Sequence, residues 1–225
     1  MKNQEAITEY YEYFKKYIDI ISKQDGRLLK KIGFAVIIDT LGRARFPEAK
    51  KDPPKRIIGL IDECSGWVDK DRVSLVQLKY ALQKCGRIDG VLLDYVNVQV
   101  GGWCNGSVPR ISEVDPMIEE VIVKAKEKEK DTVESVRHAN LFYQYRNEMV
   151  HMFKEPGHPM EVSNDGLSPY YSGMINGAQK KWELVYPLGF FEVLCTSCLN
   201  GLKKYLEEND IDPYSCYEFV DMWHR

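Results

Sequence analysis

The chain has 225 residues, of which 44% are hydrophobic and 12% aromatic, a composition that excludes a largely disordered protein and can fill a substantial core. Its formal net charge of −3 argues against a general nucleic-acid coat, because non-specific affinity comes from neutralising many phosphates, but it permits a local basic cleft. The N-terminus has no apolar signal-peptide core, and the longest apolar run, Phe34 to Ile38, is too short to span a bilayer. We therefore expect a cytoplasmic protein that does not contact a membrane.

Hydrophobic periodicity predicts helices through the first third of the chain. Apolar residues from Ile7 to Ile21 recur every three or four positions, which predicts an amphipathic helix that ends near Asp25. The further helices expected here are Arg27 to about Leu41, a short proline-bounded helix around Ile57 to Ile61, and about Asp69 to Cys85.

The middle of the chain is less regular. Residues Arg87 to Pro116 carry two glycine-containing turn pairs and predict irregular structure, with a short helix around Leu92. Alternating Lys and Glu between Pro116 and Lys130 indicate a solvated helix or helix end. A long helix is then expected from about Thr132 to Lys154, where Glu155-Pro156-Gly157 ends it.

The C-terminal part predicts a hairpin and a last long helix. Residues Tyr170 to Ile175 and Lys181 to Tyr186 flank Asn176-Gly177, which indicates a β-hairpin whose loop is longer than two residues. A helix from Leu188 to about Glu207 and a tail from Asp212 to Trp223 follow. No repeat or compositional shift marks a boundary, so we predict an all-α, mainly helical bundle with a small hairpin near residues 170–186, forming one domain over residues 1–225 with an N-terminal helical extension.

Six cysteines are scattered without a disulfide framework. Cys195 and Cys198 form a C-x-x-C, but both fall on the apolar stripe of the last helix, which favours core packing over redox or metal chemistry. No His, Cys or carboxylate cluster stands at metal-ligand spacing. We predict neither a metal nor an organic cofactor.

Arg146 lies in the middle of the apolar face of the helix expected over Thr132 to Lys154, and Asn147 and His151 follow it in the same helix. A guanidinium cannot be deprotonated, so a buried arginine needs a carboxylate, a phosphate or water to receive its donors. Asn147 and His151 are four residues apart and share a helix face, with Asn140 two turns earlier in the same polar row. An arginine, an amide and an imidazole so arranged suit the handling of a phosphodiester.

This R-N-x-x-x-H pattern, which covers only residues 146–151, resembles the R-x4-6-H motif of the HEPN superfamily. The resemblance implies an all-helical, metal-independent endoribonuclease of the kind found in toxin–antitoxin and anti-phage systems. It also implies that RNA is the substrate, that the active cleft forms where two motif helices meet in a homodimer, and that an antitoxin or another protein is a further partner.

The expected mechanism is attack of an RNA 2′-hydroxyl on the adjacent phosphate, in which only proton transfer and charge stabilisation are required of the protein. His151 is the predicted general acid or base, Arg146 stabilises the transition-state charge, and Asn147 orients the imidazole or a phosphate oxygen. Asn140 and Lys154 are the predicted substrate-binding residues. One helix supplies one histidine, so the second proton carrier would come from a two-fold partner.

Two other interpretations stay open. The motif could belong to a non-catalytic HEPN-like module that binds a nucleotide or a protein, or Arg146 could be bound to a buried acid with His151 as a satisfied polar neighbour. The exposure of His151 distinguishes these interpretations, because a general acid or base has to reach substrate. The other histidine of this helix, His138, is expected at an interface or at the edge of the core.

Overall fold

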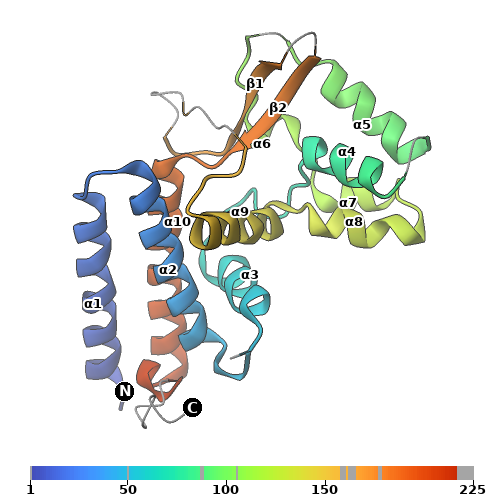
Figure 1. The fold of residues 1–225 in the computed structure, drawn as a ribbon. Helices are drawn as coiled ribbons and strands as arrows, with labels where there is room; N and C mark the ends of the chain where they lie inside the picture. Colours follow the sequence, from blue (N-terminus) through green and yellow to red (C-terminus); the bar gives the residue numbers. More distant parts are fainter. Residues whose placement is uncertain are drawn as a thin grey trace. The chain divides into compact units, whose positions relative to one another are not determined.

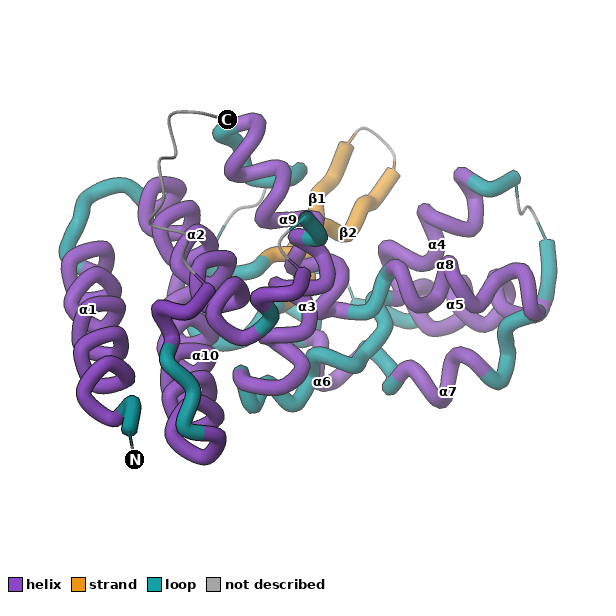
Figure 2. The backbone as a smooth tube through the Cα atoms, turned by 90° about the horizontal axis from the view of Figure 1, so that it is seen from below, coloured by secondary structure: helices purple, strands orange, loops and turns teal. Residues whose placement is uncertain are grey.

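The structure is a computed structural model that describes residues 2–49, 51–86, 89–104, 106–157, 161, 166–176 and 179–216 (Figure 1). It is mainly helical, and the sheet of the described residues is a single antiparallel pair of strands (Figure 2). The predicted all-α class with a small hairpin is therefore confirmed. No helix in the described part of the chain is both long and apolar enough to cross a bilayer.

The chain divides into two compact units. One comprises Met1–Gly66 together with Glu192–Arg225, and the other is Trp67–Phe191. The single domain expected over residues 1–225 remains a prediction.

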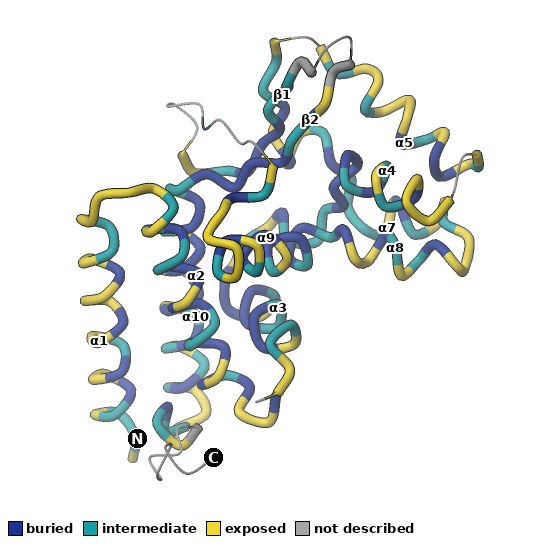
Figure 3. The backbone as a smooth tube through the Cα atoms, in the orientation of Figure 1, coloured by how far each residue is buried: buried dark blue, intermediate teal, exposed yellow. Residues whose placement is uncertain are grey.

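Among its described residues, the first unit contains three α-helices and most of a fourth. Their bounds are α1 Gln4–Ser22, α2 Arg27–Arg45, α3 Pro53–Cys64 and α10 Leu188–Asn209. The buried residues of α1 lie three or four positions apart, at Ile7, Tyr10, Phe14 and Ile18, and its other side faces solvent (Figure 3). The first helix is thus amphipathic as predicted, although it ends at Ser22, three residues before the expected boundary.

Helix α10 packs closely on the end of α3 within this unit. A Cβ atom at Gly201 would overlap the carbonyl of Cys64, so this contact requires a glycine. Cys195 and Cys198 are completely buried in α10, in agreement with the core packing expected of them. Burial raises the pKa of the Cys64 thiol to about 11 and raises the pKa values of Cys195 and Cys198 as well. At neutral pH these thiols are protonated and pack as small hydrophobic groups.

The second unit combines short helices with the hairpin. The helices are α4 Leu75–Lys84, α5 Val91–Gly101, α6 Ile111–Val114, α7 Ile118–Ile122, α8 Lys130–Ser135 and α9 His138–Met152, and the strands are β1 Tyr170–Asn176 and β2 Gln179–Val185. Helix α4 contacts α5, α8 and β2. The hairpin register pairs Tyr170 with Val185 and Asn176 with Gln179, which leaves two residues between the paired ends. The expectation of a longer hairpin loop was wrong, because pairing continues through Asn176.

Several predicted helix boundaries in this unit were also wrong. The helix expected from Asp69 begins only at Leu75, since the backbone N–H groups of Val73 and Ser74 donate to the carbonyls of Pro116 and Val136 instead of forming a helical turn. The short helix expected around Leu92 is confirmed as α5, but it runs for three turns, to Gly101, within a segment otherwise expected to be irregular. The charged segment that follows contributes only the short helix α7 before a 3-10 turn at Glu127–Glu129.

The helix predicted from Thr132 to Lys154 is two helices, α8 and α9. Between them Arg137 adopts an extended conformation, with φ −61° and ψ 141°. The N–H groups of His138 and Ala139 donate to the carbonyls of Arg72 and Lys70, at 2.9 and 3.1 Å. Hydrogen bonds to Arg72 and Lys70, which precede His138 and Ala139 by 66 and 69 residues, therefore override the helical propensity at this point.

Candidate functional site on helix α9

An aromatic cluster fixes the orientation of α9 in its unit. Phe142 and Tyr145, one turn apart on the buried face, contact Tyr186 at ring-centroid distances of 5.8 and 5.1 Å. Phe142 also lies 5.1 Å from Phe191. Edge-on and tilted packing of this kind favours one rotational setting of the helix. This packing therefore also determines which neighbouring residues the other faces of α9 contact.

The N-terminal end of α9 carries a buried polar network centred on Asp115. One carboxylate oxygen of Asp115 lies 2.8 Å from His138 Nε2 and accepts a hydrogen bond from the Tyr171 hydroxyl at 2.6 Å. The other oxygen accepts from the backbone N–H of Leu75 at 3.1 Å. On its far side, His138 Nδ1 lies 3.0 Å from the hydroxyl of Tyr186. Every side chain named here is almost completely removed from solvent.

Both tyrosines of the network are held in the neutral form. Burial, and then the charge of Asp115, raise the pKa values of Tyr171 and Tyr186 well above the ordinary 10.0. His138 itself is fully buried, deeper than the core-edge position expected from the sequence. Because its ring nitrogens contact protein groups on both sides, its role is structural: it joins α9 to the segment that holds Asp115.

The C-terminal half of α9 carries Arg146, Asn147 and His151. The Arg146 side chain is only 8% exposed, and its Nη1 donates to Asn147 Oδ1 at 3.0 Å. His151 and Lys154 are exposed. The structure therefore places Arg146 and Asn147 in direct contact and leaves the imidazole of His151 accessible from solvent.

Asn140 has a different setting from the other predicted site residues. Its Nδ2 donates to the carbonyl of Glu134 at 2.6 Å and so links the start of α9 to the end of α8. This contact gives Asn140 a structural function. A role for Asn140 or Lys154 in binding substrate remains a prediction.

A cavity of about 360 Å³ adjoins this half of α9. Its lining residues come from α4, α9, β2 and the segments after α9 and β2: Gln77, Leu141, Gln144, Tyr145, Asn147, Glu148, Pro156, Leu184 and Tyr186. His151 follows Glu148 by three residues and Asn147 by four, so it continues the cavity-lining face of the helix by one turn. The exposed histidine is therefore at the end of the row of α9 residues that borders the cavity.

A second cavity of about 250 Å³ lies next to the first and shares Gln77, Pro156 and Leu184 with it. Its other lining residues are Tyr80, Gly157, Lys181, Trp182, Glu183. Because they share these lining residues, the two cavities are hereafter called together the α9 groove, which borders α4, α9 and β2. Lys181, which is exposed, supplies a positive charge in the second half of this groove.

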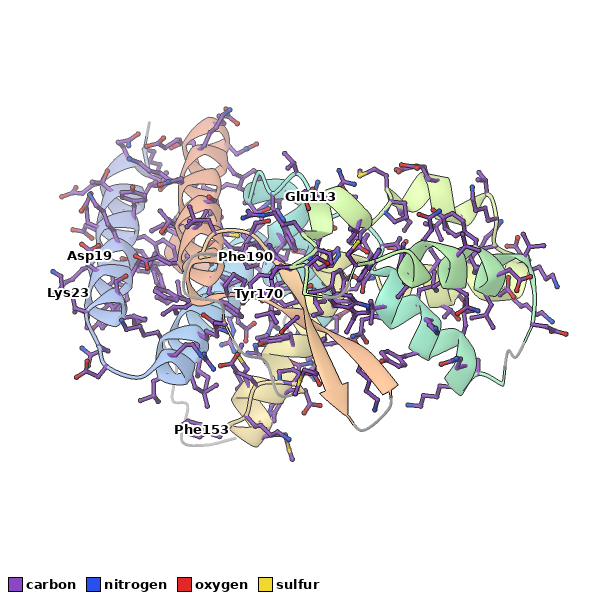
Figure 4. The ribbon with its side chains drawn as sticks, turned by 90° about the horizontal axis from the view of Figure 1, so that it is seen from above. Asp19, Lys23, Glu113, Phe153, Tyr170 and Phe190 are labelled. Atoms are coloured by element: carbon purple, nitrogen blue, oxygen red, sulfur yellow. The ribbon has the colours of Figure 1, made fainter. Side chains whose placement is uncertain are left out.

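The end of α9 is defined by the residues that follow it. Phe153 adopts a left-handed conformation, with φ 51°, and its side chain is 63% exposed at the outer end of the helix (Figure 4). Met152 beside it is 67% exposed. The Tyr145 hydroxyl donates to the buried carboxylate of Glu155 at 2.9 Å, which holds the departing chain against the helix. The exposed side chains of Met152 and Phe153 form an apolar surface next to His151 in the chain.

Comparison with models of known protein families, with curated proteins and with solved structures found no match. Within the described residues, no group of three or more His, Cys, Asp or Glu is placed to hold a metal ion.

Of the described groove residues, Asn147 was predicted from the sequence as a site residue, whereas Gln77, Gln144 and Glu148 were not. A signal for two of them was present, because Gln144, Glu148 and His151 are polar at helical spacing in a helix that is otherwise largely apolar. Gln77 precedes Gln144 by 67 residues in the chain. It reaches the groove only because α4 packs beside β2. Nothing local in the sequence indicates that proximity.

Proposed function

We propose that the protein is a metal-independent endoribonuclease whose active site is built around Arg146, Asn147 and His151. The observation that carries the proposal is the position of His151, exposed at the end of the α9 face that lines the groove. A general acid or base has to be accessible to substrate and close to a binding surface, and His151 meets both conditions. The resemblance of this motif to that of HEPN ribonucleases gives the same assignment.

The chemistry needs no group beyond these side chains and the substrate. The 2′-hydroxyl of the RNA attacks the adjacent phosphorus, the bond to the 5′-oxygen of the next nucleotide breaks, and a 2′,3′-cyclic phosphate and a 5′-hydroxyl result. His151 transfers a proton at one of the two oxygens. Arg146, positioned by its hydrogen bond to Asn147, directs its planar donors at the phosphate oxygens, and Lys154 is an exposed cation two positions beyond the end of α9 that can contact a neighbouring phosphate.

The proposal includes a homodimer, because each α9 supplies one accessible histidine whereas cleavage uses both a base and an acid. Met152 and Phe153 offer exposed apolar surface beside His151, at the place where a two-fold partner would have to bind. A dimer joined there would set two imidazoles across one cleft. Sedimentation at micromolar concentration should give a dimer, and double substitution of Met152 and Phe153 by Ser should give a monomer; a monomeric wild type contradicts this part of the proposal.

One observation favours the second candidate, a non-catalytic HEPN-like module that binds a nucleotide or a protein partner such as an antitoxin. Arg146 is largely buried and is hydrogen bonded within its own helix, as an arginine with a structural function would be. In that case the groove would bind a ligand without changing it. The two candidates differ in whether RNA is cleaved.

The proposal is tested by incubating the purified protein with single-stranded RNA and with DNA of the same sequence in excess EDTA. RNA should be cut to fragments that end in 2′,3′-cyclic phosphate, and DNA should stay intact because it lacks the nucleophile. Arg146→Ala should reduce the cleavage rate by about a hundred- to a thousandfold, as loss of a transition-state charge contact does. Arg146→Lys retains the charge without the fork and should be intermediate.

The matched control is Arg43→Ala, which removes one exposed arginine on α2 and should leave the rate unchanged. Circular dichroism of the Arg146 variants separates loss of chemistry from loss of fold. Cleavage that requires a divalent metal, yields 3′-hydroxyl ends or persists in Arg146→Ala contradicts the ribonuclease proposal. Binding of RNA without any cleavage would favour the second candidate.

A further inference from the structure

The first cavity of the α9 groove has the character of a pocket for an uncharged planar group. Its walls are aromatic or aliphatic, from Tyr145, Tyr186, Leu141, Leu184 and Pro156, and both tyrosine hydroxyls contact other protein groups. Its other polar side chains are three amides and one carboxylate. No Lys or Arg is among its described lining residues, so a phosphate would meet a carboxylate there without a counter-charge. A flat group with hydrogen-bonding edges suits these surroundings better than an anion does.

We propose that this cavity binds a guanine base of the RNA and so determines where the chain is cut. The inference rests on the proposed ribonuclease function and adds a specificity pocket to it. A volume of about 360 Å³ is within the range of small-molecule sites, which are mostly apolar with a few convergent polar groups. Unpaired RNA bases are recognised in this way, by stacking on aromatic rings and by hydrogen bonds to their edges.

Glu148 is the residue that selects guanine. An ionised carboxylate only accepts hydrogen bonds, and it offers two oxygens side by side. Guanine presents two adjacent donors on its Watson–Crick edge, N1–H and the N2 amino group, whereas adenine, cytosine and uracil do not present such a pair on that edge. Among the described residues Glu148 forms no ion pair, and it is exposed at the rim of the cavity. Its carboxylate is therefore available to a ligand.

The amides can complete the recognition of the base. Asn147 Oδ1 accepts from Arg146, which directs its Nδ2 donor away from that contact, and Gln144 Nε2 is fixed by donation to the Ser135 carbonyl at 3.1 Å. The acceptors O6 and N7 of guanine would be met by donors of Asn147 and of Gln77 on the opposite wall. An amide offers both donors and acceptors, so these side chains can adapt to different bases and contribute mainly to affinity. The carboxylate offers acceptors alone and therefore determines which base is selected.

The proposed base site is also placed correctly with respect to the chemistry. His151 lies one turn after Glu148 on the same helix face, so a base held by Glu148 brings its ribose and phosphate toward the imidazole. The neighbouring nucleotide can follow the groove into the second cavity, where Tyr80 offers a partly exposed ring for stacking and Lys181 a cation for its phosphate. Cleavage is then expected directly after guanosine.

The test uses the full-length wild-type protein and the four nucleoside 3′-monophosphates, with binding measured by isothermal titration calorimetry. Guanosine 3′-monophosphate should bind about ten- to a hundredfold more tightly than the other three, the discrimination typical of one good bidentate contact to a base. Glu148→Gln should abolish this preference, because an amide replaces one acceptor with a donor. The matched control is Glu119→Gln on α7, another exposed glutamate away from the groove, which should leave the preference unchanged.

Sequencing of the ends produced from a mixed-sequence RNA supplies an independent readout. Cuts after guanosine in the wild type, dispersed over all four bases in Glu148→Gln, support the pocket. Equal affinity for the four nucleotides, or a guanine preference that survives Glu148→Gln, overturns it. Cleavage without base preference would contradict the guanine pocket but not the ribonuclease proposal. Selective guanine binding without cleavage would contradict the ribonuclease proposal but not the pocket.

Discussion

The two ends of helix α9 each carry a histidine, and the two imidazoles differ in their exposure to solvent. His138 at the N-terminal end is completely buried, with Asp115 on one side of the ring and Tyr186 on the other. His151 at the C-terminal end is exposed beside a groove. The same side chain, thirteen residues away along one helix, is thus part of the core in one place and accessible to a ligand in the other.

The comparison shows what separates a structural polar group from a candidate functional one. A buried polar network stabilises a fold only when its members satisfy one another, and the Asp115 network does so with three elements of the chain. Residues satisfied in this way have little capacity left for a substrate. At the C-terminal end of α9 the imidazole of His151 is accessible to solvent. Catalysis would require this exposure, whereas the stability of the fold does not depend on it.

The largest effect that would test this contrast is removal of the centre of the network. Asp115→Ala should lower the free energy of unfolding by about 3–5 kcal/mol, because it leaves buried donors from His138, Tyr171 and the Leu75 backbone without their acceptor. The measurement is urea-induced unfolding. Asp19→Ala, at an exposed position of α1, is the control and should stay within about 0.5 kcal/mol of wild type (Figure 4). A loss below about 1 kcal/mol in Asp115→Ala would show that the network contributes little.

A smaller effect is expected from alkaline pH. The pKa values of Tyr171 and Tyr186 are raised in the folded state, so below pH 10 both states are protonated and the stabilisation is complete. Above pH 10 the unfolded chain loses these protons while the folded chain keeps them, and stability should fall by about 1.4 kcal/mol per pH unit for each tyrosine. Urea unfolding between about pH 9 and 11 measures the slope. In Tyr171→Phe the decline should be shallower by one such contribution, and an unchanged slope would contradict the assignment.

The smallest effect concerns the other end of α9. Phe153 has a left-handed backbone conformation that costs a non-glycine residue about 1–2 kcal/mol, and its ring is exposed. Phe153→Gly should therefore raise the free energy of unfolding by about 0.5–1 kcal/mol after the greater chain entropy of glycine is subtracted. Sedimentation of the same variant should show weaker dimerisation. A variant that is both more stable and equally dimeric would indicate that Phe153 has no part in association.

The sequence was sufficient for the fold class and for most long helices, because these follow from patterns within twenty residues. The apolar spacing from Ile7 to Ile18 and the hairpin around Asn176 are examples. It failed where distant segments meet. The break between α8 and α9 results from hydrogen bonds of His138 and Ala139 to residues 70–72, and no local pattern around Arg137 indicates it.

The candidate site likewise contains residues that local sequence indicates and residues that only long-range packing brings in. Arg146, Asn147 and His151 could be selected from one helix, since their spacing is local. Gln77 and Leu184 enter the groove only because α4 and β2 pack together, and the burial of His138 depends on the pairing of residues 70–74 with 116 and 136–139. Helical spacing predicted an interface or core-edge position for His138, but its complete burial could not be derived from the helix itself.

We propose that His151 transfers a proton during RNA cleavage and does not support the fold. The most direct measurement compares the RNA cleavage rate and the midpoint of thermal unfolding for His151→Ala and the wild type, in the same buffer with excess EDTA. We expect a rate lower by about a hundred- to ten-thousandfold with an unfolding midpoint within about 2 °C of wild type, because an exposed imidazole contributes little to stability. A His151→Ala protein that cleaves RNA at the wild-type rate would contradict it.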